Sequence, residues 1–151
     1  MQIFMLDKDP IQNAKYYCDK HMKIILEAAQ MLCTVVNDTG GISPYKSTHR
    51  KHPITLWASK SLSNWRWIRS FVAVLNEEKK FRYGTDHKSA LVAASLIEPN
   101  IPDIGLTPFP MAMPDIYKHK NNLIKSYRKY YICEKRHFCT WKNRPVPHWM
   151  G

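Results

Sequence analysis

Residues 9–41, DPIQNAKYYCDKHMKIILEAAQMLCTVVNDTGG, carry the strongest structural signal in this sequence. Asp9 followed by Pro10 is a typical helix start, because an aspartate side chain accepts the free N–H groups of the first turn and proline suits the first helical position. An apolar stripe, interrupted by His21, then recurs at intervals of three and four residues until Gly40 and Gly41. This spacing predicts one long amphipathic helix of about seven turns over residues 10–39.

Three further helices are predicted by the same criteria. Aromatic and aliphatic residues at helical spacing run from Ile54 to about Tyr83, where Gly84 ends the helix. A shorter helix, capped by Thr85 or Asp86, is expected to reach about residue 97. The last one is expected to begin at residues 114–115 and to end near Arg136.

The remaining segments predict the fold class. Residues 98–114 contain five prolines and a glycine, so they form a long irregular loop, which in compact domains tends to have a function. The C-terminal residues 138–151 are too apolar to be a free tail. We therefore expect residues 1–151 to form one all-α domain, a compact bundle of about four helices with a Pro-rich loop and a packed aromatic C-terminal tail.

Composition excludes several classes of protein. With 151 residues, of which 44% are hydrophobic, the chain can bury a core and is not a disordered tail. No apolar run reaches the roughly 18 residues of a membrane span, and residues 1–9 do not form a signal peptide, so a cytoplasmic location is expected, in the host cytoplasm if the protein is viral. Four cysteines lack metal-type spacing: Cys18, Cys33, Cys133 and Cys139. They are expected to be reduced and structural, with no metal site and no cofactor.

The positive charge is concentrated in two segments. The net charge is +11, and residues 43–69 and 118–144 carry all of this excess, whereas the rest of the chain is slightly acidic. Such segregation favours a polyanionic partner, bound in a salt-dependent way. The expected partner is nucleic acid, double-stranded DNA first, with no membrane and no obligate protein partner. The alternative is that these charges only keep solvated helix faces soluble.

Candidate site residues lie on the first predicted helix, on the face opposite the apolar stripe. A carboxylate there, Glu27, lies between Lys20 and Lys23 on one side and Gln30 on the other. Such a glutamate can stabilise positive charge at a sugar carbon or transfer a proton. The alternative is an ordinary ion pair between Lys23 and Glu27. His21, on the apolar stripe, is either a core residue or a group that supports the site.

Two basic stretches are candidate phosphate-binding segments. The loop at residues 45–53 combines cations, hydroxyls and two histidines, and residues 135–144 alternate cations with aromatic rings. Cations hold phosphates while rings stack on bases, although Trp141 could instead anchor the tail. The candidate DNA-binding and phosphate-binding residues are Lys20, Lys23, Lys46, His49, Arg50, Lys51, His52, Arg136, Trp141, Lys142 and Arg144.

Four features, in this order, resemble a known family. They are Asp19-x-His21 followed by Glu27, a basic loop that ends in His52-Pro53, a Trp-bearing helix closed by residues 82–84 (Arg-Tyr-Gly), and an aromatic, basic C-terminus. This order resembles the small all-α pyrimidine-dimer DNA glycosylases with associated lyase activity, the phage-type endonuclease V group. Together the four features span most of the chain.

The resemblance implies a helical domain that bends DNA, extrudes a base and excises a damaged or modified pyrimidine. In that family the N-terminal amine attacks the sugar C1′, forms an imine and nicks the strand by β-elimination. Met1 would supply this amine, Glu27 would match the essential glutamate and His21 a supporting histidine. Because Gln2 disfavours removal of Met1, two alternatives stay open: a non-catalytic DNA-binding protein on the same scaffold, and an enzyme acting on small nucleotides or modified bases.

Overall fold

The first predicted helix is divided into three parts in the computed structural model, which describes residues 2–151. Helix α1, Pro10–Tyr16, begins where the sequence predicts, with the Asp9 side chain accepting from the amide of Ile11. At Tyr17 the backbone becomes extended. A 3-10 helix, η1 (Asp19–Lys23), and then α2 (Ile24–Asp38) follow. The prediction of one continuous helix over residues 10–39 is therefore wrong.

Tertiary hydrogen bonds explain the break. The Cys18 amide donates to the Tyr131 hydroxyl at 2.9 Å, and the Asp19 amide donates to the Thr140 carbonyl at 2.8 Å. In a continuous helix both amides would bond to carbonyls four residues earlier. The Tyr17 hydroxyl is also buried, where it bonds both the amide and the carbonyl of Phe4. Hydrogen bonds to residues more than 100 positions away therefore replace the i to i−4 hydrogen bonds of a helix at Cys18 and Asp19.

Residues 2–151 contain six α-helices, more than the roughly four predicted, and no strand. The helices after α2 are α3 (Pro53–Lys60), α4 (Leu62–Tyr83), α5 (Lys88–Ser95) and α6 (Leu123–Glu134). Three short 3-10 helices also occur: η2 (Asp115–Tyr117), η3 (Arg136–Phe138) and η4 (His148–Met150). The all-α class is confirmed, and so is the long irregular segment before η2.

The second predicted helix divides at Ser61. Its extended backbone separates α3 from α4, and its hydroxyl bonds Asp103 and the Gly105 carbonyl in the Pro-rich loop. The helix end is as predicted, because Gly84 adopts the left-handed conformation that glycine tolerates best. The predicted cap of the next helix is wrong, since His87 rather than Thr85 or Asp86 caps α5.

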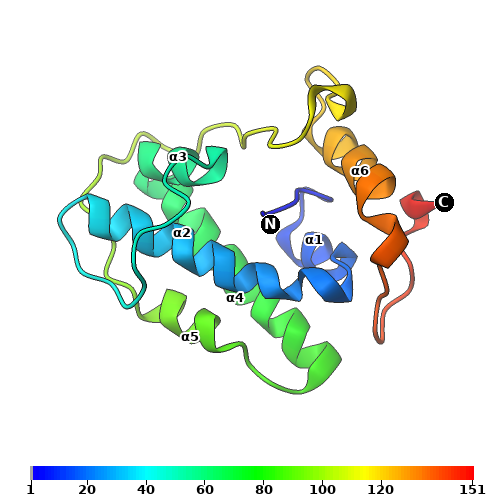
Figure 1. Ribbon diagram of the computed structural model, residues 1–151, viewed down its shortest axis with the longest axis horizontal. Helices are drawn as coiled ribbons and strands as arrows, with labels where there is room; N and C mark the ends of the chain where they lie inside the picture. The colour runs from blue at the N-terminus through cyan, green and yellow to red at the C-terminus, as the bar shows by residue number, and fades with distance from the viewer. Residues whose placement is uncertain (1) are drawn as a thin grey trace.

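The helices form a body around α2 and α4. Helix α2 packs against α3, α4 and α5, while α1 packs against α4 (Figure 1). The core between them holds the largest buried side chains, among them Trp65, Phe71, Leu32 and Met31. The apolar stripe recognised in residues 14–35 is buried as expected, although its helix is interrupted.

Helix α6 joins this body through the N-terminal segment, residues 2–6, which runs between α2 and α6 (Figure 1). The Phe4 ring contacts Tyr131 of α6 at 5.0 Å between centroids and His21 of η1 at 4.8 Å. The Arg128 side chain donates to the Leu6 carbonyl at 2.8 Å. A short apolar run at the N-terminus therefore forms the connection between the two parts of the molecule.

A buried arginine connects α1, η1, α4 and the C-terminal segment. The Arg82 side chain is fully buried and donates to Glu78, to Asp19 and to the carbonyl of Lys15. Glu78 also accepts two hydrogen bonds from Arg144 at 2.9 Å. Burial alone would raise the pKa values of Asp19 and Glu78. Hydrogen bonds from the Lys142 amide, the Thr140 hydroxyl and then Arg82 lower the pKa of Asp19 below its usual value, and Arg144 and Arg82 do the same for Glu78. Both carboxylates therefore stay ionised at neutral pH.

Within residues 2–151, no helix has the length and the apolar run that crossing a bilayer requires.

We expect Arg82→Met to lower the free energy of unfolding by about 3–5 kcal/mol at pH 7, because it removes the cation shared by the buried Glu78 and the partly buried Asp19. The two lowered pKa values make this contribution complete above about pH 5, and it declines as the pH falls through the folded-state values. Urea unfolding at pH 7 and pH 3 measures both effects. Arg66→Met, which breaks a half-exposed pair with Glu98, is the control and should cost less than about 1 kcal/mol. Equal losses in the two variants would contradict the assignment.

Candidate functional site

The face of α2 that the sequence analysis selected carries a carboxylate with an unusual environment. Glu27 lies in the first turn of α2, and its Oε2 atom is buried without a hydrogen-bond partner among residues 2–151. Lys23, one turn earlier, is exposed. A helix N-terminus favours a negative charge, but a buried carboxylate oxygen with no donor costs free energy. Glu27 is therefore a position where a bound ligand would supply missing interactions.

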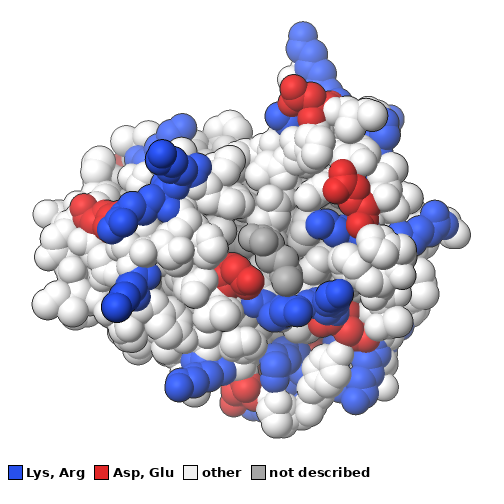
Figure 2. Space-filling model, in the orientation of Figure 1, with Lys and Arg blue, Asp and Glu red and all other residues white. Residues whose placement is uncertain are grey.

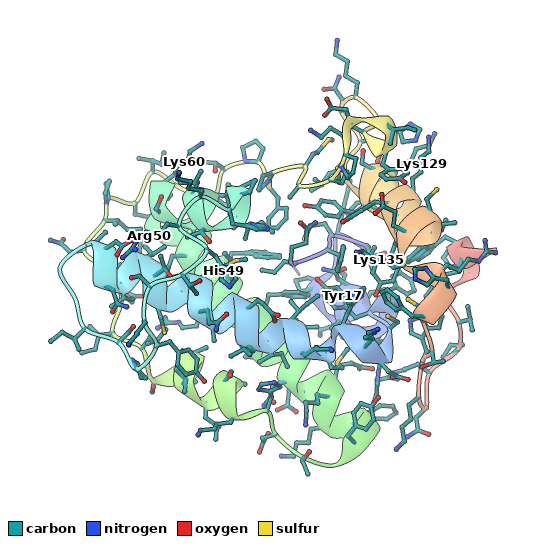
Figure 3. The ribbon with its side chains drawn as sticks, viewed as in Figure 1. Tyr17, His49, Arg50, Lys60, Lys129 and Lys135 are labelled. Atoms are coloured by element: carbon teal, nitrogen blue, oxygen red, sulfur yellow. The ribbon has the colours of Figure 1, made fainter. Side chains whose placement is uncertain are left out.

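The basic loop crosses α2 just beyond Glu27. Thr34 accepts from the Thr48 amide at 2.8 Å, and the Thr34 hydroxyl lies 2.6 Å from the Thr48 carbonyl. One turn nearer to Glu27, the His49 Nε2 atom lies 3.0 Å from Gln30 Oε1. Figure 3 shows His49 against the middle of α2. These contacts hold the loop on the same helix face as Glu27.

The backbone of His49 is in the left-handed region, with φ of 57°. A non-glycine residue in this conformation is strained and persists only where its surroundings hold it. Two contacts do so here: the side-chain contact with Gln30 and the hydrogen bond from the His52 amide to the His49 carbonyl. These contacts hold His49 in this conformation, with its ring against Gln30 of α2.

Two more histidines begin helices near this face. His52 accepts from the Ile54 amide and His87 from the Ser89 amide, each through Nδ1 at 3.1 Å, which leaves Nε2–H as the free donor of each neutral ring. Burial, and then the charge of His49, lower the pKa of His52. Burial and Lys79 lower the pKa of His87, and the Glu27 carboxylate opposes them. His87 is thus an electrostatic neighbour of Glu27.

Sequence reasoning did not select His87. A usable signal was present, because His87 precedes a helical run as His52 does, two residues before the amide that its ring accepts. Nothing in the sequence indicated that α5 packs beside α2, which brings His87 close to Glu27.

Cations lie on both sides of a hollow in this face of the molecule. Figure 2 shows the hollow between the part formed by α2 and α3 and the part formed by α6, with lysine and arginine side chains on either side of it. On this face the hollow separates the cations into two groups (Figure 2). On the α6 side, Lys20 lies over the Phe138 ring at 4.6 Å and Lys135 over the Tyr130 ring at 5.2 Å. Each pair joins one residue of the 135–144 stretch to a residue outside it, so cations and rings do lie together here, although not as the alternation within 135–144 that the sequence suggested.

The arginine side chains bind partners within the structure. Six of the seven form ion pairs, and the seventh, Arg136, donates to the Gly151 carbonyl. Arg50 pairs with Asp38 in an exposed contact, whereas Arg144 is held by the buried Glu78. The lysines of the candidate set behave differently. Lys20, Lys23, Lys46, Lys51 and Lys142 are exposed and form no ion pair within residues 2–151.

Other candidates have mainly structural contacts. His21 is buried, with Nδ1 against the Tyr131 hydroxyl and 3.5 Å from the Cys18 sulfur. It belongs to the packing behind the site and does not face solvent. Trp141 donates from its indole nitrogen to the Tyr16 carbonyl at 2.8 Å, which anchors the C-terminal segment. Met1 lies outside the described residues.

The cysteines are free thiols, and Cys18 and Cys33 are buried as the apolar stripe indicated. The neighbouring Cys139 thiol, and then His21, lower the pKa of Cys18, whereas burial opposes them. No group of three or more His, Cys, Asp or Glu side chains in residues 2–151 is arranged to hold a metal ion.

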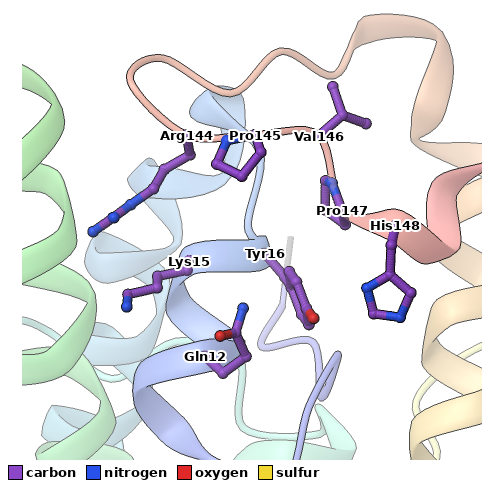
Figure 4. Close-up of a pocket in the computed structure, with 8 residues that line it drawn as sticks. All are labelled: Gln12, Lys15, Tyr16, Arg144, Pro145, Val146, Pro147 and His148. Carbon is purple, nitrogen blue, oxygen red and sulfur yellow. The ribbon is translucent and has the colours of Figure 1, made fainter.

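A separate pocket of 440 Å³ lies between α1 and residues 144–148 (Figure 4). Lys15, Tyr16 and His148 line it, together with the segment Pro145–Pro147. Arg144 also lines the pocket, and its side chain extends toward α4, where it binds Glu78 (Figure 4). The pocket contains none of the residues around Glu27.

Comparisons with protein-family models, with curated proteins and with solved structures find no match to this chain.

Thr34→Val should loosen the loop over α2, because valine keeps the shape of the buried side chain and removes both contacts to Thr48. We expect a loss of about 1–3 kcal/mol in the free energy of unfolding and faster hydrogen exchange at the Thr48 amide. Amide exchange followed by NMR measures this. Thr39→Val, which removes a hydroxyl that bonds only within its own helix, is the control. Unchanged protection of Thr48 would show that other contacts hold the loop.

Proposed function

We propose that this protein binds DNA and excises a damaged or modified pyrimidine, as a DNA glycosylase with associated lyase activity. One observation carries the proposal: the Glu27 carboxylate, with a buried and unpartnered oxygen among residues 2–151, lies beside a histidine-bearing basic loop. The resemblance to the pyrimidine-dimer glycosylases assigns the essential glutamate of that family to the same residue.

The environment of Glu27 suits a positive charge that develops during reaction. When the bond between a base and its sugar breaks, positive charge appears at C1′ and the ring oxygen. A carboxylate held in a partly desolvated position stabilises such charge more strongly than one in water. Since the Oε2 atom of Glu27 is already buried, little water has to be displaced from it when the substrate binds. In this proposal Glu27 touches the reacting sugar.

The nucleophile of the proposed reaction comes from the resemblance alone. A neutral α-amine, with an ordinary pKa near 8, would form a bond to C1′ as the bond to the base breaks. The amine nitrogen then loses a proton as the sugar ring opens to the imine. Removal of a C2′ proton from the imine expels the 3′ phosphate and nicks the strand.

Lysines supply the contacts to phosphate in this proposal. Lys46 and Lys51 of the basic loop and Lys142 of the C-terminal segment are exposed. Lysine holds a phosphate as a point charge and does not read sequence, so this arrangement favours contacts along the backbone. The neutral rings of His52 and His87 keep an Nε2–H free to donate to a base or a phosphate oxygen.

Glu27→Gln tests the proposal. The variant should reduce excision on duplex DNA that carries pyrimidine lesions by at least about 100-fold, with affinity for the same DNA changed by less than threefold, because glutamine keeps the shape and loses the charge. Single-turnover excision and borohydride trapping of the imine are the measurements. Glu77→Gln, which removes an exposed glutamate of α4, is the matched control.

Two outcomes would contradict the proposal. If wild-type protein neither excises nor forms a borohydride-trapped cross-link on any lesion-bearing duplex, and yet binds DNA, the protein is a non-catalytic binder. If it binds mononucleotides tightly and DNA weakly at every length, its substrate is a small nucleotide.

A further inference from the structure

A second hollow lies on the side of α6 that is turned away from Glu27. Its volume is 430 Å³, within the range of small-ligand sites. Figure 3 shows Lys129 on this outer side of α6 and Lys135 on the side that faces α2. The outer hollow is therefore distinct from the one between α2 and α6.

Its lining combines an apolar floor with a cationic rim. Ile124 and Ile132, two turns apart on α6, are half-buried in it. Lys125 and Lys129, on the adjacent stripe of the helix, are exposed and form no ion pair within residues 2–151. No acidic side chain lines the hollow. Arg128 completes the wall, but its charge is already paired with Asp7.

The environment of His119 shows that positive charge is in excess at the rim of the hollow. Its amide is fixed by the Ser126 hydroxyl at 2.8 Å, which holds the residue over the first turn of α6. Burial lowers the pKa of its imidazole, and the charges of Lys125 and Lys129 lower it further. Three groups that can carry positive charge thus face one small space, and an anion there would relieve their repulsion.

We propose that this outer hollow binds a phosphorylated nucleoside, supplied by a strand of nucleic acid. The phosphate lies between Lys125, Lys129 and His119, and the base packs against Ile124, in the first turn of α6. This inference rests on the proposed function, because it makes the hollow a holding site for a flanking nucleotide on the far side of α6 from the reacting one.

The shape of the hollow favours a strand over a membrane surface. Ile124 and Ile132 are half-buried and lie two turns apart, so they expose two separate apolar spots and not the continuous apolar face that inserts into a bilayer, whereas one base can pack against a single spot. Phosphate forms charge-assisted hydrogen bonds with lysine and with protonated histidine. The isoleucine floor gives a base an apolar surface that free phosphate could not use.

The first test follows the His119 imidazole by NMR. Titration with thymidylyl-thymidine, which carries one phosphodiester, should raise the pKa of His119, because a nearby anion favours the protonated ring. Inorganic phosphate should give a smaller shift at equal concentration. If inorganic phosphate raises the pKa of His119 as much as the dinucleotide does, the nucleoside assignment is wrong. If neither ligand changes this pKa, the hollow is not an anion site.

The second test uses Lys125→Glu/Lys129→Glu, with Lys80→Glu/Lys88→Glu as a control of equal charge change at exposed lysines elsewhere. Relative to the control, the first variant should bind a 20-nucleotide single strand at least tenfold more weakly and lose about 1.4 from the slope of log K against log salt. Equal effects in the two variants would overturn the proposal. So would wild-type binding to vesicles containing phosphatidylserine that exceeds binding to the strand.

The two proposals can fail separately. The His119 shift should persist in Glu27→Gln protein, and excision at saturating DNA should persist in Lys125→Glu/Lys129→Glu protein. If excision is absent in every assay but the dinucleotide still raises the pKa of His119, only the reaction is excluded. If the shift is absent while excision occurs, only the outer site is excluded.

Discussion

The buried guanidinium of Arg82 constrains much of this structure. A charge without exposure to water requires partners on several sides, and here they come from α4, from the Asp19 region and from the end of α1. Because Glu78 also binds Arg144 and Asp19 also accepts from the Lys142 amide, the same network fixes the C-terminal segment. Helix η1, which leads directly into Glu27, is therefore positioned from both ends of the chain.

The helical class and most helix ends could be predicted from local signals, although the last helix, expected to begin at residues 114–115, begins at Leu123. Asp9, Pro10 and Gly84 act within a few residues, so their effects were correctly anticipated. The interruptions at Tyr17 and Ser61 could not be, because they depend on hydrogen bonds to Tyr131, Thr140 and Asp103. Apolar periodicity indicates which side of a segment is buried. It does not indicate whether the backbone amides bond within the same helix. The stripe in residues 14–35 therefore stays buried although the backbone changes from α to 3-10 geometry.

The sequence predicted which residues form the candidate site better than it predicted which of their charges are neutralised by partners. Glu27 and the basic loop were recognised from spacing and residue type, and the structure places His49 one helical turn from Glu27. The division between arginines and lysines was not predictable, since most arginines are neutralised by acids distant in sequence, such as Arg66 by Glu98. Formal net charge therefore overstates what a polyanion could contact, and exposed lysines provide most of the accessible positive charge. His87 was missed because its closeness to Glu27 arises from the packing of α5 on α2.

The imidazole caps of α3 and α5 make the two helix starts sensitive to acid. A ring accepts its backbone amide through Nδ1 only while that nitrogen carries no proton. Since the folded state lowers the pKa values of His52 and His87, this capping is complete above their ordinary value of 6.5 and is lost as the pH falls below it. Protonation of each ring would thus remove one capping hydrogen bond from the first turn of its helix. At α5 the lost contact would belong to His87, the histidine whose imidazole interacts with the Glu27 carboxylate.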